Sequence, residues 1–225
     1  MERAVRDWVR RDPAGYGYLL DFYRRGARVC YAGEDGLVLK NEEFDICYAG
    51  GTASSPELEA GRLVLVEDRA LAERLAARDA GLGIMECRQC MYLREDPPRA
   101  ECPGAVLRPL TPEDLDFVLE NYHHPGAFPE HIRGRIAEGM LGAEVGGRLA
   151  GFIGIHEEGA MGLLEVLPQF RRRGLAEALE AALIGRQLGK GALPYAQVRI
   201  GNTASEALQE KLGLTFDRRV LYWIG

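Results

Sequence analysis

Residues 164–176 constrain the fold of this chain more than any other stretch. They read Leu-Glu-Val-Leu-Pro-Gln-Phe-Arg-Arg-Arg-Gly-Leu-Ala, which indicates a strand that ends at Pro168, a short basic turn with Gly174, and the start of a helix. The first turn of a helix carries free backbone N–H groups and the positive end of the peptide dipoles. Because a glycine lets a ligand approach the backbone and three arginines add positive charge, this turn predicts a site for a phosphorylated ligand.

The composition restricts the class of protein. The chain has 225 residues, 47% of them hydrophobic, which allows one large domain or two small ones with a buried core. Its net charge of −6 argues against a general nucleic-acid binder, which would be basic. Residues 1–7 lack the apolar core of a signal peptide, and no apolar run approaches the ~18 residues that span a membrane. We therefore expect a soluble cytoplasmic protein without nucleic-acid or membrane partners.

The five cysteines do not predict a disulfide framework, because their number is odd and no signal peptide precedes them. Cys87 and Cys90 have CxxC spacing, but no second pair of cysteines or histidines follows at zinc-site spacing. They also fall in a strand-like run rather than at a helix start, where redox cysteines usually lie. We expect two structural cysteines and no metal, with metal binding and redox chemistry as the alternatives.

The first hundred residues have the pattern of a small mixed α/β module. The expected helices are residues 2–10, 16–25 and 69–78, and the expected strands are residues 28–31, 37–39, 44–48, 62–66 and 84–93. Residues 96–104 are rich in proline and charge and predict a linker. We therefore expect an N-terminal α/β domain at residues 1–98 and a second domain at residues 104–225.

The second half is more regular. Thr111, Pro112 and Asp114 form the pattern of a capped helix start. The helix after the basic turn has apolar residues at the spacing of a core-facing stripe: Leu175, Leu179, Ala182 and Leu183. The expected strands are 105–108, 142–145, 149–155, 161–167 and 195–200, the expected helices are 112–122, 129–140, 172–188 and 203–212, and residues 214–224 are extended. This order predicts an α+β fold.

Two motifs in this half carry a resemblance to a known family. Residues 171–176, Arg-Arg-Arg-Gly-Leu-Ala, fit the R/Q-x-x-G-x-G/A pyrophosphate motif of the GNAT superfamily, the acyl-CoA-dependent N-acyltransferases. Residues 202–214 resemble the N-x-x-S and L-Y-x-K-L-G-F motifs that follow in that family. Residues 167–171 and the downstream Asn202 are especially similar to the glycine N-acyltransferase-like (FR47-like) branch. The resemblance covers about residues 105–225.

The resemblance implies a fold and a cosubstrate. The implied fold is a central, mostly antiparallel, splayed sheet flanked by helices. A smaller N-terminal α/β domain precedes it. Because an N-terminal half-domain also precedes the GNAT domain in this branch, the N-terminal domain here could be a degenerate GNAT-like half. Acetyl-CoA is the implied cosubstrate, with its pantetheine on the backbone of Val166 and Leu167. Its pyrophosphate is implied to lie on the next turn, at Arg171, Arg172, Arg173, Gly174, Leu175 and Ala176. Asn202 and Ser205 complete the implied CoA site, and no metal is implied.

The general acid of this family does not have its usual residue here. Gln209 stands where the family often has the tyrosine that protonates the leaving thiolate. Glutamine donates a hydrogen bond but supplies no proton at neutral pH. Tyr195 and Tyr222 are the candidate substitutes, and the alternative for each is a packed strand aromatic.

The usual general base of the glycine N-acyltransferase branch is also absent from its position. Ala160 stands where the glycine N-acyltransferase branch has a strand glutamate, which leaves Glu165 as the only carboxylate in this strand. Strict alternation places Glu165 on the face of Leu163 and Met161, away from the face of Ala160, unless a bulge re-aims it. The alternative for Glu165 is a buried carboxylate that binds backbone amides or an arginine.

Two residues in the turn before this strand are further candidates for the base. His156 and Glu158 lie near the place where acceptors enter in this fold, and histidine titrates in the useful range. The alternative for both is a solvated turn. His123, His124 and His131 flank the loop that shapes the acceptor pocket in the family, and we expect surface or capping roles for them.

The sequence therefore predicts transfer of an acetyl group, or of another short acyl group, from CoA to an amine of a small molecule or amino acid. We expect direct attack on the thioester, because no cysteine lies near residues 171–176 in the sequence. The alternatives are an acyl-CoA-binding GNAT-like protein without transferase activity, and a protein whose N-terminal half serves assembly. A homodimer is compatible with the sequence.

Overall fold

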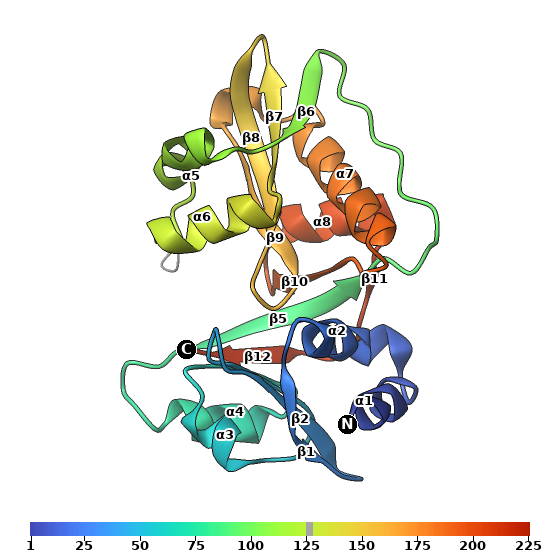
Figure 1. The fold of residues 1–225 in the computed structure, drawn as a ribbon, viewed down its shortest axis with the longest axis vertical. Coiled ribbons are helices and arrows are strands. Elements are labelled where there is room, and N and C mark those ends of the chain that lie inside the picture. The colour runs from blue at the N-terminus through green and yellow to red at the C-terminus, as the bar shows by residue number, and fades with distance from the viewer. Residues whose placement is uncertain (125–127) are drawn as a thin grey trace. The chain divides into compact units, whose positions relative to one another are not determined.

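The structure, a computed structural model, describes residues 1–124 and 128–225, and it consists of two compact units (Figure 1). Unit 1 comprises Met1–Leu93, Tyr195–Gln209 and Leu214–Gly225, and unit 2 comprises Arg94–Pro194 and Glu210–Gly213. Among the described residues, no helix combines the length and the apolar character that crossing a membrane requires.

Unit 1 is built on a sheet in the order β1-β2-β3-β4-β12-β5-β10, with β11 also on β5. All neighbours are antiparallel except β3 and β4, which are parallel. The strands are β1 (Arg28–Ala32), β2 (Gly36–Asn41), β3 (Ile46–Gly51), β4 (Leu63–Val66), β5 (Ile84–Met91), β10 (Tyr195–Arg199), β11 (Thr215–Phe216) and β12 (Leu221–Ile224).

Four helices complete unit 1, and a fifth leaves it. These are α1 (Glu2–Val9), α2 (Pro13–Arg24), α3 (Pro56–Ala60) and α4 (Arg69–Ala76), while α8 (Thr203–Leu212) runs from unit 1 into unit 2. Short polar side chains cap three of them: Asp12 caps α2, Ser55 caps α3 and Asp68 caps α4. The aromatic core stacks Phe22 on Tyr48 with ring centroids 4.4 Å apart.

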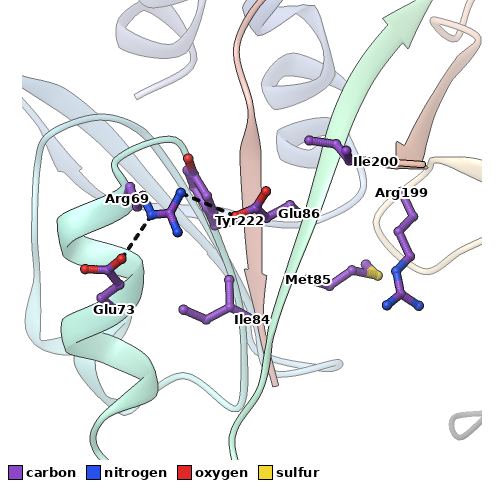
Figure 2. A pocket seen from close by; sticks show the side chains of 8 residues that line it. All are labelled: Arg69, Glu73, Ile84, Met85, Glu86, Arg199, Ile200 and Tyr222. Carbon is purple, nitrogen blue, oxygen red and sulfur yellow. Dashed lines mark hydrogen bonds and ion pairs between the residues drawn. The ribbon is translucent and has the colours of Figure 1, made fainter. Parts of the chain in front are cut away.

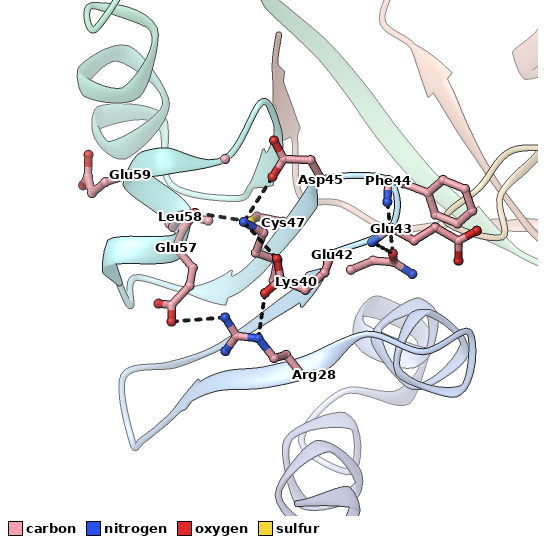
Figure 3. A network of polar contacts seen from close by, with 12 residues as sticks. Arg28, Lys40, Glu42, Glu43, Phe44, Asp45, Cys47, Glu57, Leu58 and Glu59 are labelled. Atoms are coloured by element: carbon pink, nitrogen blue, oxygen red, sulfur yellow. Dashed lines mark hydrogen bonds and ion pairs between the residues drawn. The ribbon is translucent and has the colours of Figure 1, made fainter. Parts of the chain in front are cut away.

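The cysteines of β3 and β5 are buried in unit 1. Cys47 of β3 lies beside an ion-pair network in which Lys40 contacts Asp45 at 3.1 Å and Arg28 contacts Glu42 at 2.8 Å (Figure 3). Burial raises the pKa of the Cys47 thiol to about 12, so it stays protonated and unreactive. Cys87 and Cys90 are buried three residues apart on β5, which directs their side chains to opposite faces.

Unit 2 is an antiparallel meander in the order β6-β7-β8-β9. Figure 1 shows helices α5 and α6 on one side of this sheet and α7 on the other. The elements are β6 (Ala105–Pro109), η1 (Pro112–Asp114), α5 (Leu115–Asn121), α6 (Pro129–Glu138), β7 (Leu141–Val145), β8 (Arg148–Ile155), β9 (Met161–Val166), η2 (Pro168–Phe170) and α7 (Leu175–Gly189).

The helices of unit 2 are held by an apolar cluster and by one capping network. Phe152 of β8 is fully buried and packs with Val118 of α5 and Ile136 of α6. At the start of η1, the expected cap is present, because Asp114 accepts hydrogen bonds from the Thr111 N–H at 2.7 Å and from Arg108 at 2.7 and 2.8 Å. The hydrogen bond from Arg108, acting against burial, lowers the pKa of Asp114 to about 2.

The expected fold class is confirmed: the chain is a mixed α/β protein with a mostly antiparallel sheet and flanking helices. The compact units do not follow the sequence-based division at residues 98 and 104, because β10 and β12 pair with β4 and β5. The division into functional domains at 1–98 and 104–225 stays a prediction. Helix α7 begins at Leu175, three residues later than expected, because Arg172 and Gly174 have positive φ angles of 63° and 84°.

Candidate functional site

The basic turn after β9 has the geometry of an anion site. Gly174 is the N-cap of helix α7: its φ of 84° suits glycine, and it provides no side-chain cap for the first N–H groups of the helix. Arg171, Arg172 and Arg173 are exposed around this helix start. Uncapped N–H groups, the helix dipole and three guanidinium groups together favour a phosphate or pyrophosphate.

Arg171 connects this turn to β9. Its Nε donates to the Val166 carbonyl oxygen at 2.9 Å, and its Nη2 donates to Glu165 Oε1 at 3.0 Å. The Val166 carbonyl therefore points away from β8, whereas the Leu167 N–H donates to Ala150 of β8 at 2.9 Å. Val166 and Leu167 are the two positions expected to bind pantetheine through their backbone. The peptide groups of Val166 point to the edge of β9 opposite β8, whereas the N–H of Leu167 is already bonded to β8.

A cysteine contacts the basic turn in the structure, although none lies near it in the sequence. Cys102 Sγ donates to the Arg173 carbonyl oxygen at 3.0 Å, although the two residues are far apart in the sequence. The neighbouring carbonyl of Glu101 would lie 3.7 Å from a Cβ at Gly174. The thiol sits at the turn expected to hold pyrophosphate rather than an acyl group, so it does not argue for a covalent intermediate.

A bulge in β9 re-aims Glu165. Phe152 pairs with Glu165 and Gly154 pairs with Gly162, so two residues of β9, Leu163 and Leu164, face a single residue of β8. Leu163 has a φ of 48° at this point. Strict alternation is therefore wrong here, and Glu165 lies on the same face as Gly162 and Phe152 rather than with Met161.

The same face carries His156. A Cβ at Gly162 would collide with the His156 ring, so the ring lies over β9 at the position of this glycine. Desolvation, opposed by the charge of Glu157, lowers the pKa of His156 to about 4. The imidazole is therefore neutral at pH 7 and can accept a hydrogen bond.

The turn after β8 gathers carboxylates beside His156. Ligand atoms of His156, Glu157 and Glu158 lie within 4.8 Å of one another. Glu157 pairs with His131 and lies 4.0 Å from Arg135 Nε. Burial raises the pKa of Glu157, but the hydrogen bond from His131 and the nearby positive charges outweigh it and lower that pKa to about 2. His131 thus differs from the surface role expected for it, while His123 and His124 are exposed as expected.

Sequence reasoning missed Tyr122. Desolvation, followed by the charges of Glu158, Glu157 and Glu165, raises its pKa to about 12. Its ring stacks on His124 with centroids 5.8 Å apart and meets Phe152 edge-on at 6.3 Å. A protonated phenol thus shares the neighbourhood of the candidate bases. The signal in the sequence was the Tyr-His-His run at the end of α5.

The remaining candidates belong to unit 1. Tyr195 is fully buried with its ring 6.1 Å from Tyr18, and Gln209 is buried with Oε1 3.8 Å from Cys90 Sγ. Asn202 is exposed and its Oδ1 accepts from the Ser205 N–H at 3.2 Å, which caps the start of α8. The roles of Tyr195, Asn202 and Ser205 stay predictions.

Unit 1 contains a second strand–helix–strand segment, β4–α4–β5, without the features of the basic turn. Strand β12 lies between β4 and β5 and pairs with both of them. At the start of α4, the Asp68 carboxylate accepts from the Leu71 N–H at 2.6 Å. A carboxylate already satisfies this helix start, so an anion is disfavoured there.

Comparisons with known proteins agree with this geometry. Residues 139–224 match the family model of FR47-like proteins. No curated protein matches the chain. A Drosophila protein of known structure has a TM-score of 0.65 and 22% identity over 84% of this chain and 73% of its own.

Two bacterial structures cover nearly the whole chain. A putative acetyltransferase from the GNAT family of Novosphingobium aromaticivorans has a TM-score of 0.58 and 18% identity, over 94% of this chain and 96% of its own. A GCN5-related N-acetyltransferase from Kribbella flavida has a TM-score of 0.59 and 14% identity, over 93% of both chains. At these identities the structures show the shared fold. Residues 139–224 are therefore similar to FR47-like proteins, and the chain shares its fold with structures described as GNAT-family and GCN5-related N-acetyltransferases.

Proposed function

We propose that this protein transfers an acetyl group from acetyl-CoA to an amine of a small molecule or amino acid. The observation that carries the proposal is the uncapped start of α7, with Gly174 and three exposed arginines directly after β9. Pyrophosphate would bind this turn, and the pantetheine amides would pair with the Val166 edge of β9. Asn202 and Ser205 are proposed to contact pantetheine from the start of α8.

The bulge in β9 supplies a group for the reacting carbonyl. Because Leu163 and Leu164 face one residue of β8, one backbone group of the bulge has no partner in the ladder. An N–H donor at this place would stabilise the oxygen of the thioester as it gains negative charge.

Proton transfer is assigned to the face of β9 that carries Glu165 and His156. The attacking amine forms the new C–N bond and loses a proton to Glu165, directly or through water, while the C–S bond breaks and the thiolate takes a proton from a tyrosine. Tyr122 is our first candidate for this acid, because its raised pKa of about 12 keeps it protonated. Tyr195 stays a second candidate. His156 and Glu158 would orient the amine.

Two measurements test the proposal. Acetyl-CoA should raise the melting temperature, since a ligand at 100 times its Kd adds about 2.7 kcal/mol of stability. Gly174→Glu should abolish this shift, because it places bulk and negative charge at the helix start. Gly191→Glu is the matched control: Gly191 has a φ of 67° just after the other end of α7, with open space around it. Equal loss in both variants, or no shift in the native protein, would contradict the site.

A second function, acyl-CoA binding without transfer, is supported by two residues. Gln209 cannot protonate a thiolate, and Ala160, which is 2% exposed, provides no carboxylate. A binding protein would show the thermal shift with acetyl-CoA but no release of CoA with any amine of a panel. Release of CoA that depends on an amine would decide for the transferase.

A further inference from the structure

Unit 1 contains a cavity of about 320 Å³ that the proposed acyl transfer does not use (Figure 2). Residues of four elements line it: the first two turns of α4, the start of β5, Tyr222 of β12, and the chain at the end of β10. This volume lies at the lower end of the range of about 300–1,000 Å³ for small-molecule sites.

One wall of the cavity is an unpaired edge of β5. Strand β10 pairs with β5 only from Cys87 to Met91, and the last link is the Ile200 N–H, which donates to the Glu86 carbonyl at 3.0 Å. The peptide groups of Glu86 therefore point to this edge, and by alternation those of Ile84 do as well. Within the described chain, the Glu86 N–H and the peptide groups of Ile84 have no backbone partner on this edge.

Apolar side chains concentrate at the same place. Ile84, Met85 and Ile200 are 40%, 38% and 43% exposed, and they make up three of the eight large hydrophobic residues exposed in the described chain. Ile84 and Met85 point to opposite faces of β5, as Figure 2 shows. A ligand in this cavity would cover apolar surface on both faces of the strand edge.

The charges of the cavity are divided between its two sides. On the α4 side, Arg69 lies 3.0 Å from Glu73 and 3.6 Å from Glu86. On the other side of β5, the Arg199 guanidinium has no hydrogen-bond or ion-pair partner in residues 1–124 and 128–225 (Figure 2). Arg199 is thus the one lining cation whose charge is available to a ligand.

We infer that this cavity binds a short extended peptide that ends in a free carboxylate. The peptide backbone pairs with the unpaired edge at Ile84 and Glu86, which is the mode of strand addition. Successive side chains of the peptide then alternate between Ile84 on one face and Met85 on the other. The terminal carboxylate binds the Arg199 guanidinium, whose fork of donors matches it.

The experiment uses the full chain and a defined probe, an N-acetylated tripeptide of alanine, leucine and valine. The free acid and the C-terminal amide of this peptide are titrated by calorimetry and by amide NMR. We expect the acid to bind about tenfold more tightly than the amide, because one charge-assisted contact is lost. Shifts should centre on the backbone amides of residues 84–86 and 200.

Arg199→Gln should reduce the affinity for the acid to that for the amide and leave the amide unaffected. Arg218→Gln is the matched control, because Arg218 is an exposed arginine of unit 1 that does not line the cavity. The inference is overturned if neither peptide binds at millimolar concentration, if Arg199→Gln binds the acid as the native protein does, or if the NMR shifts avoid residues 84–86. None of these outcomes depends on CoA binding, so they are independent of the proposed acyl transfer.

Discussion

The contacts of Arg171 make a quantitative prediction for Glu165→Gln. In the free protein, one guanidinium binds both the Glu165 carboxylate and the Val166 carbonyl, at 3.0 and 2.9 Å. At the proposed site, bound CoA would need Arg171 for its pyrophosphate and the Val166 carbonyl for its pantetheine, so binding would break both contacts. The Arg171 and Glu165 side chains are 56% and 31% exposed, which limits their ion pair to about 0.2–1 kcal/mol. Glu165→Gln should therefore tighten CoA binding by a factor of about 1.4–5.

Calorimetry with CoA, which cannot transfer an acyl group, measures this effect. Glu177→Gln is the control, because Glu177 lies in the first turn of α7 and pairs with Lys211 instead of Arg171. Any general gain from removing negative charge near the anion appears in both variants. The additional gain of Glu165→Gln should vanish in an Arg171→Gln background. Equal gains in the two variants, or a gain that persists without Arg171, would refute the reasoning.

Three further predictions concern stoichiometry, pH and capping. Calorimetry should find one CoA per chain, because β12 fills the space between β4 and β5 in unit 1; two sites would contradict this. The pKa of His156 is lowered to about 4, so the unfolded chain binds its proton first as the pH falls below about 6.5. The free energy of unfolding in urea should therefore fall by about 1–2 kcal/mol between pH 7 and 5, and His156→Asn should remove that part of the pH dependence. Asp114→Asn should cost about 1–3 kcal/mol, since Asp114 binds Arg108 and the Thr111 N–H; the exposed Asp116→Asn in the same helical turn should cost little.

The sequence predicted the parts of the site that are local. Residues 171–176 are contiguous, and a glycine at the start of a helix next to basic residues indicates an anion site in any fold. The capping pattern at Thr111 and Asp114 could also be predicted from the sequence, because a cap joins residues only three positions apart.

The features of the site that depend on contacts between residues far apart in the sequence could not be predicted from the sequence. The bulge places a leucine, Leu163, at a positive φ, where glycine or asparagine would have been the usual signal. The face of Glu165 follows from its register with β8, and the contact of Cys102 with Arg173 depends on the path of the linker. Tyr122 became a candidate only once packing placed three carboxylates around it.

The position of β12 has a consequence for how the protein is made. Strands β4 and β5 are separated by a strand that the ribosome produces long after both of them. Until β12 arrives, β4 and β5 each keep an open edge, and open edges pair readily with other chains. The sheet of unit 1 is therefore completed only at the end of synthesis. A fragment of residues 1–93 expressed alone should aggregate unless a peptide of residues 214–225 is supplied.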